Sequence, residues 1–273
     1  MKRIEARFKA LRASRKAALV PYIMAGCPDV EHTVDILNAL VMGGADLIEL
    51  GVPFSDPMAD GAVIQRASDQ AIRNGVRLHH VLDMVAQFRL RDVQTPIVLM
   101  SYINPILAMG ENHFIARAVS AGVDGVLAVD YPPEECQNFA HALIDNDLAP
   151  IFLLAPTSSA LRAQQVEKLG RGYIYYVSLK GVTGASHINL EEVGSALATI
   201  RQGTHMPVGV GFGIRDSQSA AHVASFADAV IVGSLFIQTL EGVPTGQLAA
   251  VARKTAQSLR AAMDEARTSE ETS

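Results

Sequence analysis

The 273-residue chain contains no tryptophan, few other aromatic residues and only two cysteines. Cys27 and Cys136 lie far apart in the sequence and lack the short spacing of metal-binding or redox pairs. Sparse cysteines of this kind are typical of proteins kept in a reducing compartment. We therefore expect a cytoplasmic protein.

The chain also lacks an excess of positive charge and a long apolar run. Its formal net charge is −5, with acidic and basic residues scattered along the sequence, so nucleic acid is not an expected partner. No apolar run approaches the roughly 20 residues that span a bilayer. The segment Ala17–Cys27 is similar to the end of an export signal, but it contains Pro21 and follows a long segment that carries Glu5. We interpret it as a buried strand and expect no membrane association.

Hydrophobic residues make up 49% of the sequence, enough to bury one large core. The length allows a doubly wound sheet, two small domains or a (β/α)8 barrel of roughly 250 residues. One sequence pattern is repeated along the chain: an amphipathic helix, a small residue and a short apolar run. Apolar runs that do not alternate with polar residues are typical of parallel strands buried on both faces.

We predict eight such strands, within Leu19–Met24, Gly43–Leu50, Pro96–Met100, Ala121–Val129, Ile151–Leu154, Tyr173–Val177, Val208–Val210 and Ala224–Gly233. Helices are predicted at Glu31–Met42, Leu78–Arg89, His113–Ser120, Pro133–Asp145, Ala160–Leu169, Leu190–Ile200, Ser217–Ser225 and Gln247–Ala266. An extra helix, Arg3–Arg12, precedes the first strand and could cover the barrel floor. Eight strand–helix units without a Pro-, Gly- or Ser-rich linker predict an α/β fold, a TIM barrel. We expect a single domain over residues 1–273, with a frayed tail from about residue 268.

Two carboxylates stand near the end of the second predicted strand, in IELGVPFSDPMADG. Glu49 lies inside the apolar strand, where an unpaired carboxylate is costly, and Asp60 follows in a loop restricted by Pro53 and Pro57. Because barrel enzymes place functional groups at the carboxyl ends of strands, the two acids can converge over a substrate for acid–base catalysis. Alternatively, Glu49 is a salt-bridged structural acid. Asp56 reads as a simple turn former.

Glycines cluster at the ends of the last two predicted strands, in GVGFGIRDSQS and VGS. The loops after strands seven and eight of a barrel usually bind a phosphate group. N–H groups at Gly211, Gly213 and Gly233, with the hydroxyl of Ser234, can bind that anion without a cation. Tight turns also need glycine, but two glycine sites in adjacent loops favour a phosphate site.

The segment Tyr173–His187, YIYYVSLKGVTGASH, leads from a strand into a long glycine-broken polar loop. Successive strand residues face opposite sides, so Tyr175 and Tyr176 cannot both enter the pocket. The loop is either a mobile lid that excludes water or an ordinary surface loop. His79 and His80 lack a third ligand spaced for zinc, and we predict no metal site.

Together these segments resemble the tryptophan synthase alpha chain family, from about Leu19 to about Ser234. The resemblance rests on LIELGVPFSDPMADG around the two acids, PYIMAGCPD at the first strand, PTSS after the fifth, YYVSLKGVTGA at the lid and PVGVGFGI at the phosphate loop. It implies catalytic roles for Glu49 and Asp60, with Tyr175 supporting the site. The implied phosphate ligands are Gly184, Gly211, Phe212, Gly213, Gly233 and Ser234, and the implied indole pocket is Tyr22, Met100, Tyr102, Leu127 and Thr183. Departures from the family pattern occur at Tyr22, Ala62, Met100, Leu179 and Lys180, none of them one of the two acids.

The reaction implied by the resemblance is retro-aldol cleavage of indole-3-glycerol phosphate to indole and glyceraldehyde 3-phosphate, in tryptophan biosynthesis. Glu49 would transfer protons at the reacting carbons, and Asp60 would stabilise positive charge on the indole N–H. No cofactor is expected in this chain. Pyridoxal phosphate (PLP) is expected in a partner beta chain within an α2β2 assembly, coupled to this site through the loop Pro53–Asp60 and the lid Leu179–Asn189.

Three other functions are weighed against this one. A stand-alone lyase that releases indole freely would share every catalytic residue. A non-catalytic activator of a beta chain could dispense with Glu49 or Asp60, yet both are present. A phosphate-sugar isomerase on the same fold would explain the glycines but not the SDPMADG loop.

Overall fold

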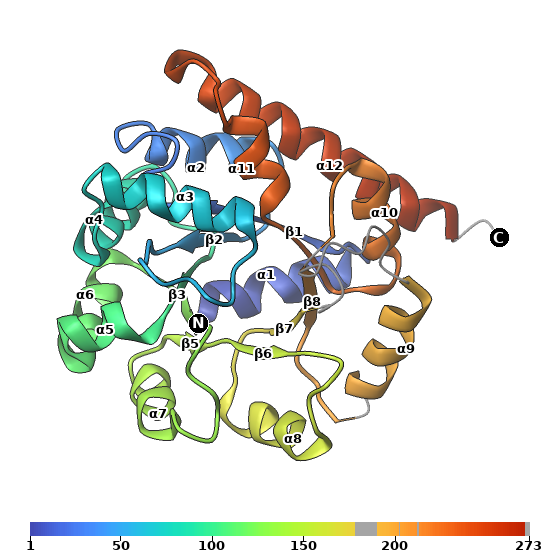
Figure 1. Ribbon diagram of the computed structural model, residues 1–273. Helices are drawn as coiled ribbons and strands as arrows, with labels where there is room; N and C mark the ends of the chain where they lie inside the picture. The colour runs from blue at the N-terminus through green and yellow to red at the C-terminus, as the bar shows by residue number, and fades with distance from the viewer. Residues whose placement is uncertain (178–189, 202, 212, 271–273) are drawn as a thin grey trace.

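The computed structural model describes residues 1–177, 190–201, 203–211 and 213–270. Parallel strands form one sheet in the order β5-β4-β3-β2-β1-β9-β8-β7-β6, surrounded by helices (Figure 1). The strands are β1 Ala18–Met24, β2 Ile48–Gly51, β3 Ile97–Ser101, β4 Gly125–Ala128, β5 Ala149–Pro150, β6 Phe152–Leu154, β7 Ile174–Val177, β8 Val208–Gly211 and β9 Ala229–Val232.

The barrel closes through its fifth strand, which is divided at Ile151. β5 pairs with β4, and β6 pairs with β7. Between them the N–H of Ile151 donates to the carbonyl of Val126 at 2.9 Å, and the carbonyl of Pro150 accepts from the N–H of Arg171 at 3.0 Å. The predicted (β/α)8 barrel is confirmed, with its fifth strand in two pieces.

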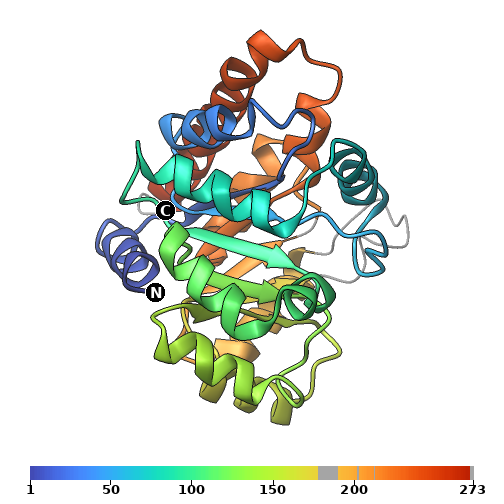
Figure 2. The ribbon, with the colours of Figure 1, turned by 90° about the vertical axis from the view of Figure 1, so that its left-hand side faces the viewer.

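Apolar side chains fill the barrel interior. This interior cluster contains Val20, Leu47, Val98, Leu127, Ile151, Tyr173, Tyr175 and Ile231. Ile4 and Phe8 of α1 (Lys2–Ala13) join it, so the predicted extra helix does cover the floor, at the end where the strands begin (Figure 2). Tyr176 instead packs between the strands and the outer helices. Of the two adjacent tyrosines, only Tyr175 therefore faces the interior.

An aspartate precedes three of the strands and helps to fix the barrel floor. Each of these carboxylates accepts a hydrogen bond from an N–H near the start of a neighbouring strand and pairs with an arginine. The sets are Asp46 with Leu19 and Arg260, Asp124 with Ile97 and Arg89, and Asp228 with Val208 and Arg201. They hold the strand beginnings together and leave the opposite ends open to a functional site.

The outer helices are α2 Thr33–Met42, α3 Ala62–Arg73, α4 Leu78–Arg89, α5 Ile103–Met109, α6 Glu111–Ala121, α7 Gln137–Asp145, α8 Ala160–Leu169, α9 Leu190–Arg201, α10 Ser217–Phe226, α11 Ser234–Leu240 and α12 Leu248–Glu270, with a 3-10 turn, η2, at Thr245–Gln247. Three of them, α3, α5 and α11, were not predicted. The first is amphipathic, because Ala67, Ser68 and Ala71 are buried while Asp69, Gln70 and Arg73 are exposed, so its helical pattern was present in the sequence. α5 contains Pro105, and α11 begins at Ser234 within the segment assigned to phosphate binding.

Candidate active site

Glu49 lies in β2 with its side chain fully buried. Its Oε1 accepts a hydrogen bond from the hydroxyl of Tyr173, and its Oε2 has no hydrogen-bond partner among the residues that the structure describes. Burial raises the pKa of Glu49 to about 8, and the bond from Tyr173 opposes part of that rise. At pH 7 Glu49 is therefore mostly a neutral acid, and the unpartnered Oε2 can carry the proton.

Tyr173 is a site residue that the sequence analysis did not single out. It precedes β7, which is across the barrel from β2 in the strand order, and its side chain is fully buried. The ring of Phe8 packs against it with a centroid separation of 5.8 Å. The available signal was its spacing of two residues from Tyr175, since residues two apart in a strand face the same side.

Asp60 ends the loop that follows β2, and its carboxyl group is close to Tyr102. The hydroxyl of Tyr102 donates to Oδ2 of Asp60 at 3.2 Å and accepts from the N–H of Ala59 at 2.9 Å. The side-chain amide of Gln65 in α3 donates to the backbone carbonyl of Asp60 at 2.9 Å, which ties the loop to the helix. Burial raises the pKa of Asp60 to about 6, and the bond from Tyr102 opposes that rise.

A small pocket lies beside Asp60 and Tyr102 at the carboxyl end of the barrel, and Glu49 is not among the residues that line it. It is lined by Tyr22, Met24, Val52, Phe54, Pro57, Asp60, Ser68, Met100, Ser101, Tyr102 and Val129. Burial raises the pKa of the Tyr22 hydroxyl well above its ordinary value, and the nearby charges of Asp60 and Glu49 raise it further. The charges of both acids thus act on the same phenol. Of the residues expected to form the indole pocket, Tyr22, Met100 and Tyr102 line this space, while Leu127 is buried in β4 at the register position of Met100.

Two glycines make room for the tyrosines of the site. A Cβ at Gly51 would overlap with the hydroxyl of Tyr22, and a Cβ at Gly211 would overlap with the hydroxyl of Tyr175. Tyr175 is buried in the interior cluster, and the charges of Glu49 and Asp60 help to raise the pKa of its hydroxyl. The charges of both acids therefore act on Tyr175, whereas the hydrogen bond to Glu49 comes from Tyr173.

The glycine segments expected to bind phosphate follow two adjacent strands. Gly211 of β8 pairs with Ile231 of β9, so the loops after these strands begin side by side. Gly213 has a φ of 77°, a left-handed conformation that favours glycine. Ser234 is exposed at the first position of α11. The remaining predicted positions, Thr183, Gly184 and Phe212, and the lid residues Leu179 and Lys180, lie outside the described residues.

Within the described parts of the chain, no group of three or more His, Cys, Asp or Glu side chains is placed to hold a metal ion. In the same residues, no helix has both the length and the apolar character needed to cross a membrane.

Comparison with known proteins decides the family. The sequence matches the family model of the tryptophan synthase alpha chain over residues 8–268. The chain belongs to the tryptophan synthase alpha chain family. The alpha chain of Cupriavidus pinatubonensis is 54% identical over 264 residues, which cover 97% of this chain and 100% of that protein. The alpha chain of Aromatoleum aromaticum is 53% identical over 265 residues, 97% of this chain and 98% of that protein.

Solved structures agree with this assignment. Tryptophan synthase subunit alpha from Legionella pneumophila is 40% identical and has a TM-score of 0.91, with 96% of this chain and 98% of that chain covered. A chain of Mycobacterium tuberculosis tryptophan synthase is 35% identical and has a TM-score of 0.87, with 96% and 98% covered.

As a tryptophan synthase alpha chain, this protein is a carbon–carbon lyase that cleaves indole-3-glycerol phosphate in tryptophan biosynthesis. The alpha chain carries no cofactor, because pyridoxal phosphate belongs to the beta chain. The predicted family and activity are confirmed. The roles of individual residues stay predictions.

Proposed function

We propose that cleavage takes place at the carboxyl end of the barrel, with Glu49 as the proton carrier and Asp60 as the carboxylate that faces the indole N–H. The observation that carries this proposal is the pair of buried carboxyl groups whose pKa values are raised to different levels, about 8 and about 6. At pH 7 the first is mostly protonated and the second mostly ionised. Two acids separated in this way suit the two halves of an acid–base mechanism.

The reaction begins when Glu49 donates its proton to C3 of the indole ring. The ring then carries a positive charge at its N–H, which the carboxylate of Asp60 stabilises. The Glu49 carboxylate next accepts the proton of the side-chain hydroxyl on the carbon bound to C3. A carbonyl forms there, and the bond to C3 breaks with its electron pair returning to the ring. Indole and glyceraldehyde 3-phosphate are released, and Glu49 is protonated again.

The remaining residues hold the two ends of the substrate. Tyr22, Met100, Tyr102 and Leu127 supply the apolar walls against which an indole ring packs, and Tyr175 supports the arrangement from β7. At the phosphate end, the loops after β8 and β9 supply N–H groups at Gly211, Gly213 and Gly233 and the hydroxyl of Ser234. The adjacency of β8 and β9 supports this assignment.

The chain is further proposed to act in a cytoplasmic α2β2 assembly, in which a PLP-dependent beta chain receives the indole. The Mycobacterium tuberculosis structure to which it is similar is a tryptophan synthase. The loop Pro53–Asp60 offers a surface for the partner, because Met58 at its tip is 86% exposed while Asp60 lines the pocket. The two free cysteines suit a reducing compartment.

Site-directed variants test the catalytic assignment, with indole release and substrate binding measured on each. Glu49→Gln keeps the shape of the side chain and should retain binding while losing nearly all cleavage. Asp60→Asn should be severe but leave a trace. Asp56→Asn is the matched control, since Asp56 is in the same loop and its side chain accepts a hydrogen bond only from Ser55 among described residues. If Glu49→Gln kept more than about a tenth of the rate, its lost transition-state stabilisation would be under roughly 1.4 kcal/mol, and the assignment would be wrong.

A further inference from the structure

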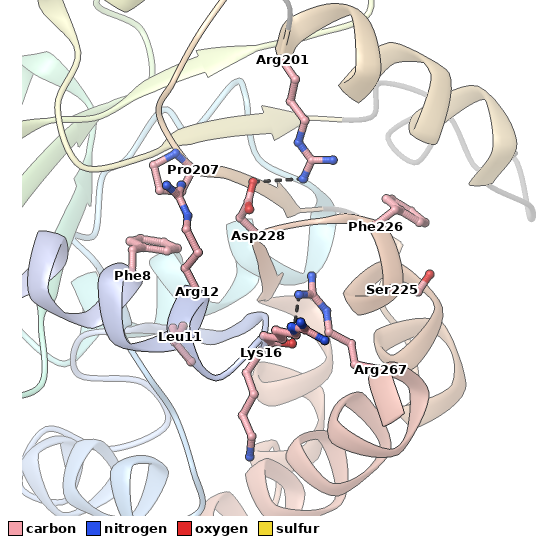
Figure 3. Close-up of a pocket in the computed structure, with 11 residues that line it drawn as sticks. Phe8, Leu11, Arg12, Lys16, Arg201, Pro207, Ser225, Phe226, Asp228 and Arg267 are labelled. Atoms are coloured by element: carbon pink, nitrogen blue, oxygen red, sulfur yellow. Dashed lines mark hydrogen bonds and ion pairs between the residues drawn. The ribbon is translucent and has the colours of Figure 1, made fainter. Parts of the chain in front are cut away.

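The floor of the barrel, at the end opposite the active site, contains a cavity larger than the pocket beside Asp60. Its volume is about 520 Å³, within the range of small-molecule sites. It lies between α1, the end of α9, the start of β8, the end of α10 and α12 (Figure 3). Nothing in the catalytic scheme uses it.

This floor cavity is strongly basic although the whole chain has a net charge of −5. Its cationic lining residues are Arg12, Arg15, Lys16, Arg201 and Arg267. Among the described residues that line it, Asp228 is the single acid. Oδ2 of Asp228 already accepts from Arg201 at 3.1 Å and from the N–H of Val208 at 3.0 Å, so its charge is largely offset.

The cations differ in how they are held. The guanidinium of Arg267 donates to the carbonyls of Ala224, Ala227 and Arg15, which fixes it as a rigid positive wall. Lys16 pairs with Asp264 at 2.8 Å. The exposed guanidinium of Arg12, by contrast, has no hydrogen-bond or ion-pair partner in the part of the chain that the structure describes. It is available to a ligand.

Flat apolar surfaces complete the lining. They come from Phe8, Leu11, Pro207 and Phe226. Phe8 is only 8% exposed and is held by the ring of Tyr173, so this wall is in place before any ligand binds. Figure 3 shows the two phenylalanines on opposite sides of the arginines.

Arginine in the last turn of a helix commonly offsets the helix dipole. Arg12, Arg201 and Arg267 each occupy such a turn, in α1, α9 and α12. That role explains each arginine separately. The barrel brings the carboxyl ends of α9 and α12 to the floor, which accounts for the gathering of the arginines but not for the aromatic rings that wall the same cavity.

We propose that the floor cavity is a second ligand site, for a small organic anion that combines a flat ring with a doubly charged phosphate or dicarboxylate group. Arg12 and Arg201 bind the anionic group, because the planar guanidinium matches the oxygens of phosphate and carboxylate. Phe8, Pro207 and Phe226 contact the ring. This site is separate from the catalytic assignments above and does not depend on them.

Because the chain contains no tryptophan, a single introduced tryptophan can report binding by its fluorescence. Phe226→Trp places the only indole fluorophore in the floor cavity, and its emission is followed at low ionic strength during titration with three probes. Adenosine 5′-monophosphate carries both a ring and a phosphate dianion, adenosine carries only the ring, and inorganic phosphate carries only the anion. The first should bind at least about tenfold more tightly than either of the others.

Arg12→Gln should weaken binding of the monophosphate at least about tenfold, whereas Arg73→Gln should not change it. Arg73 is the matched control because it is also an exposed arginine in the last turn of a helix, α3, but does not line the cavity. Calorimetry on the chain that retains Phe226 repeats the comparison without the reporter, and unchanged indole release shows that each variant is folded. Equal affinities for monophosphate and adenosine, or equal affinities in Arg12→Gln and Arg73→Gln, would overturn the proposal.

Discussion

The buried carboxyl group of Glu49 should lower the free energy of unfolding of the protein at neutral pH. Glu49→Gln should therefore make the protein more stable at that pH. The unfolded chain exposes a glutamate with its ordinary pKa of 4.5, whereas burial raises the pKa in the folded protein to about 8. Between these two pH values the folded protein binds a proton that the unfolded chain releases. Folding stability therefore falls as the pH rises from about 4.5 to about 8.

The size of the effect follows from those two pKa values. At pH 7, the raised pKa of Glu49 lowers the free energy of unfolding by about 3 kcal/mol. That is a large part of the stability of an ordinary domain. Gln has the shape of Glu, can accept the hydrogen bond of Tyr173 through its carbonyl and has no proton to gain. Glu49→Gln should thus match the parent near pH 5 to within about 1 kcal/mol and exceed it by about 3 kcal/mol or more at pH 8.

Urea unfolding followed by circular dichroism measures this difference, because the chain has no tryptophan to report by fluorescence. Glu265→Gln removes the same charge from an exposed position of α12 and should change stability by less than about 0.5 kcal/mol at either pH. A stability difference between Glu49→Gln and the parent that is the same at pH 5 and pH 8 would refute the reasoning. So would a variant less stable than the parent at pH 8.

Three further predictions concern the groups around the two acids. Tyr173→Phe removes a donor that stabilises the Glu49 carboxylate, so the pKa of Glu49 should rise by about one unit and the alkaline limb of the pH–rate profile should move up with it; Tyr176→Phe, on the outer face of β7, should leave that limb in place. Tyr102→Phe should raise the pKa of Asp60 by a similar amount and move only the acidic limb. Gly51→Ala should displace the Tyr22 ring and lower the cleavage rate, with part of the loss recovered in Gly51→Ala/Tyr22→Phe; indole-release assays that show no recovery would indicate a different cause.

The strands were predictable because each is an apolar run buried on both faces, a pattern that local composition records directly. The helix α3 was missed although its sequence carries a helical pattern. Its buried positions, Ala67, Ser68 and Ala71, recur at helical spacing, and Arg66, Asp69, Gln70 and Arg73 lie on the exposed face. The division of the fifth strand at Ile151 depends on how β4 and β7 meet it, and no local pattern encodes that closure.

In the site, Glu49 and Asp60 could be predicted because a carboxylate in an apolar strand and an acid in a proline-rich loop are both unusual. The contact between Glu49 and Tyr173 could not be predicted from local sequence. The two residues are 124 positions apart and meet only because the barrel places β2 and β7 across from each other. The alternation rule separates Tyr175 from Tyr176, but it does not say which interior tyrosine reaches the acid.

The pH dependence of kcat/KM for indole release from indole-3-glycerol phosphate tests the central claim most directly, since it reports the pKa values of groups in the free enzyme. Cleavage requires Asp60 ionised and Glu49 protonated. The profile should rise as pH passes about 6 and fall as pH passes about 8, the pKa values of those two groups. A rate that continues to rise through pH 8, or stays level to pH 9 and above, would contradict the account, because Glu49 would then not begin the reaction as the acid.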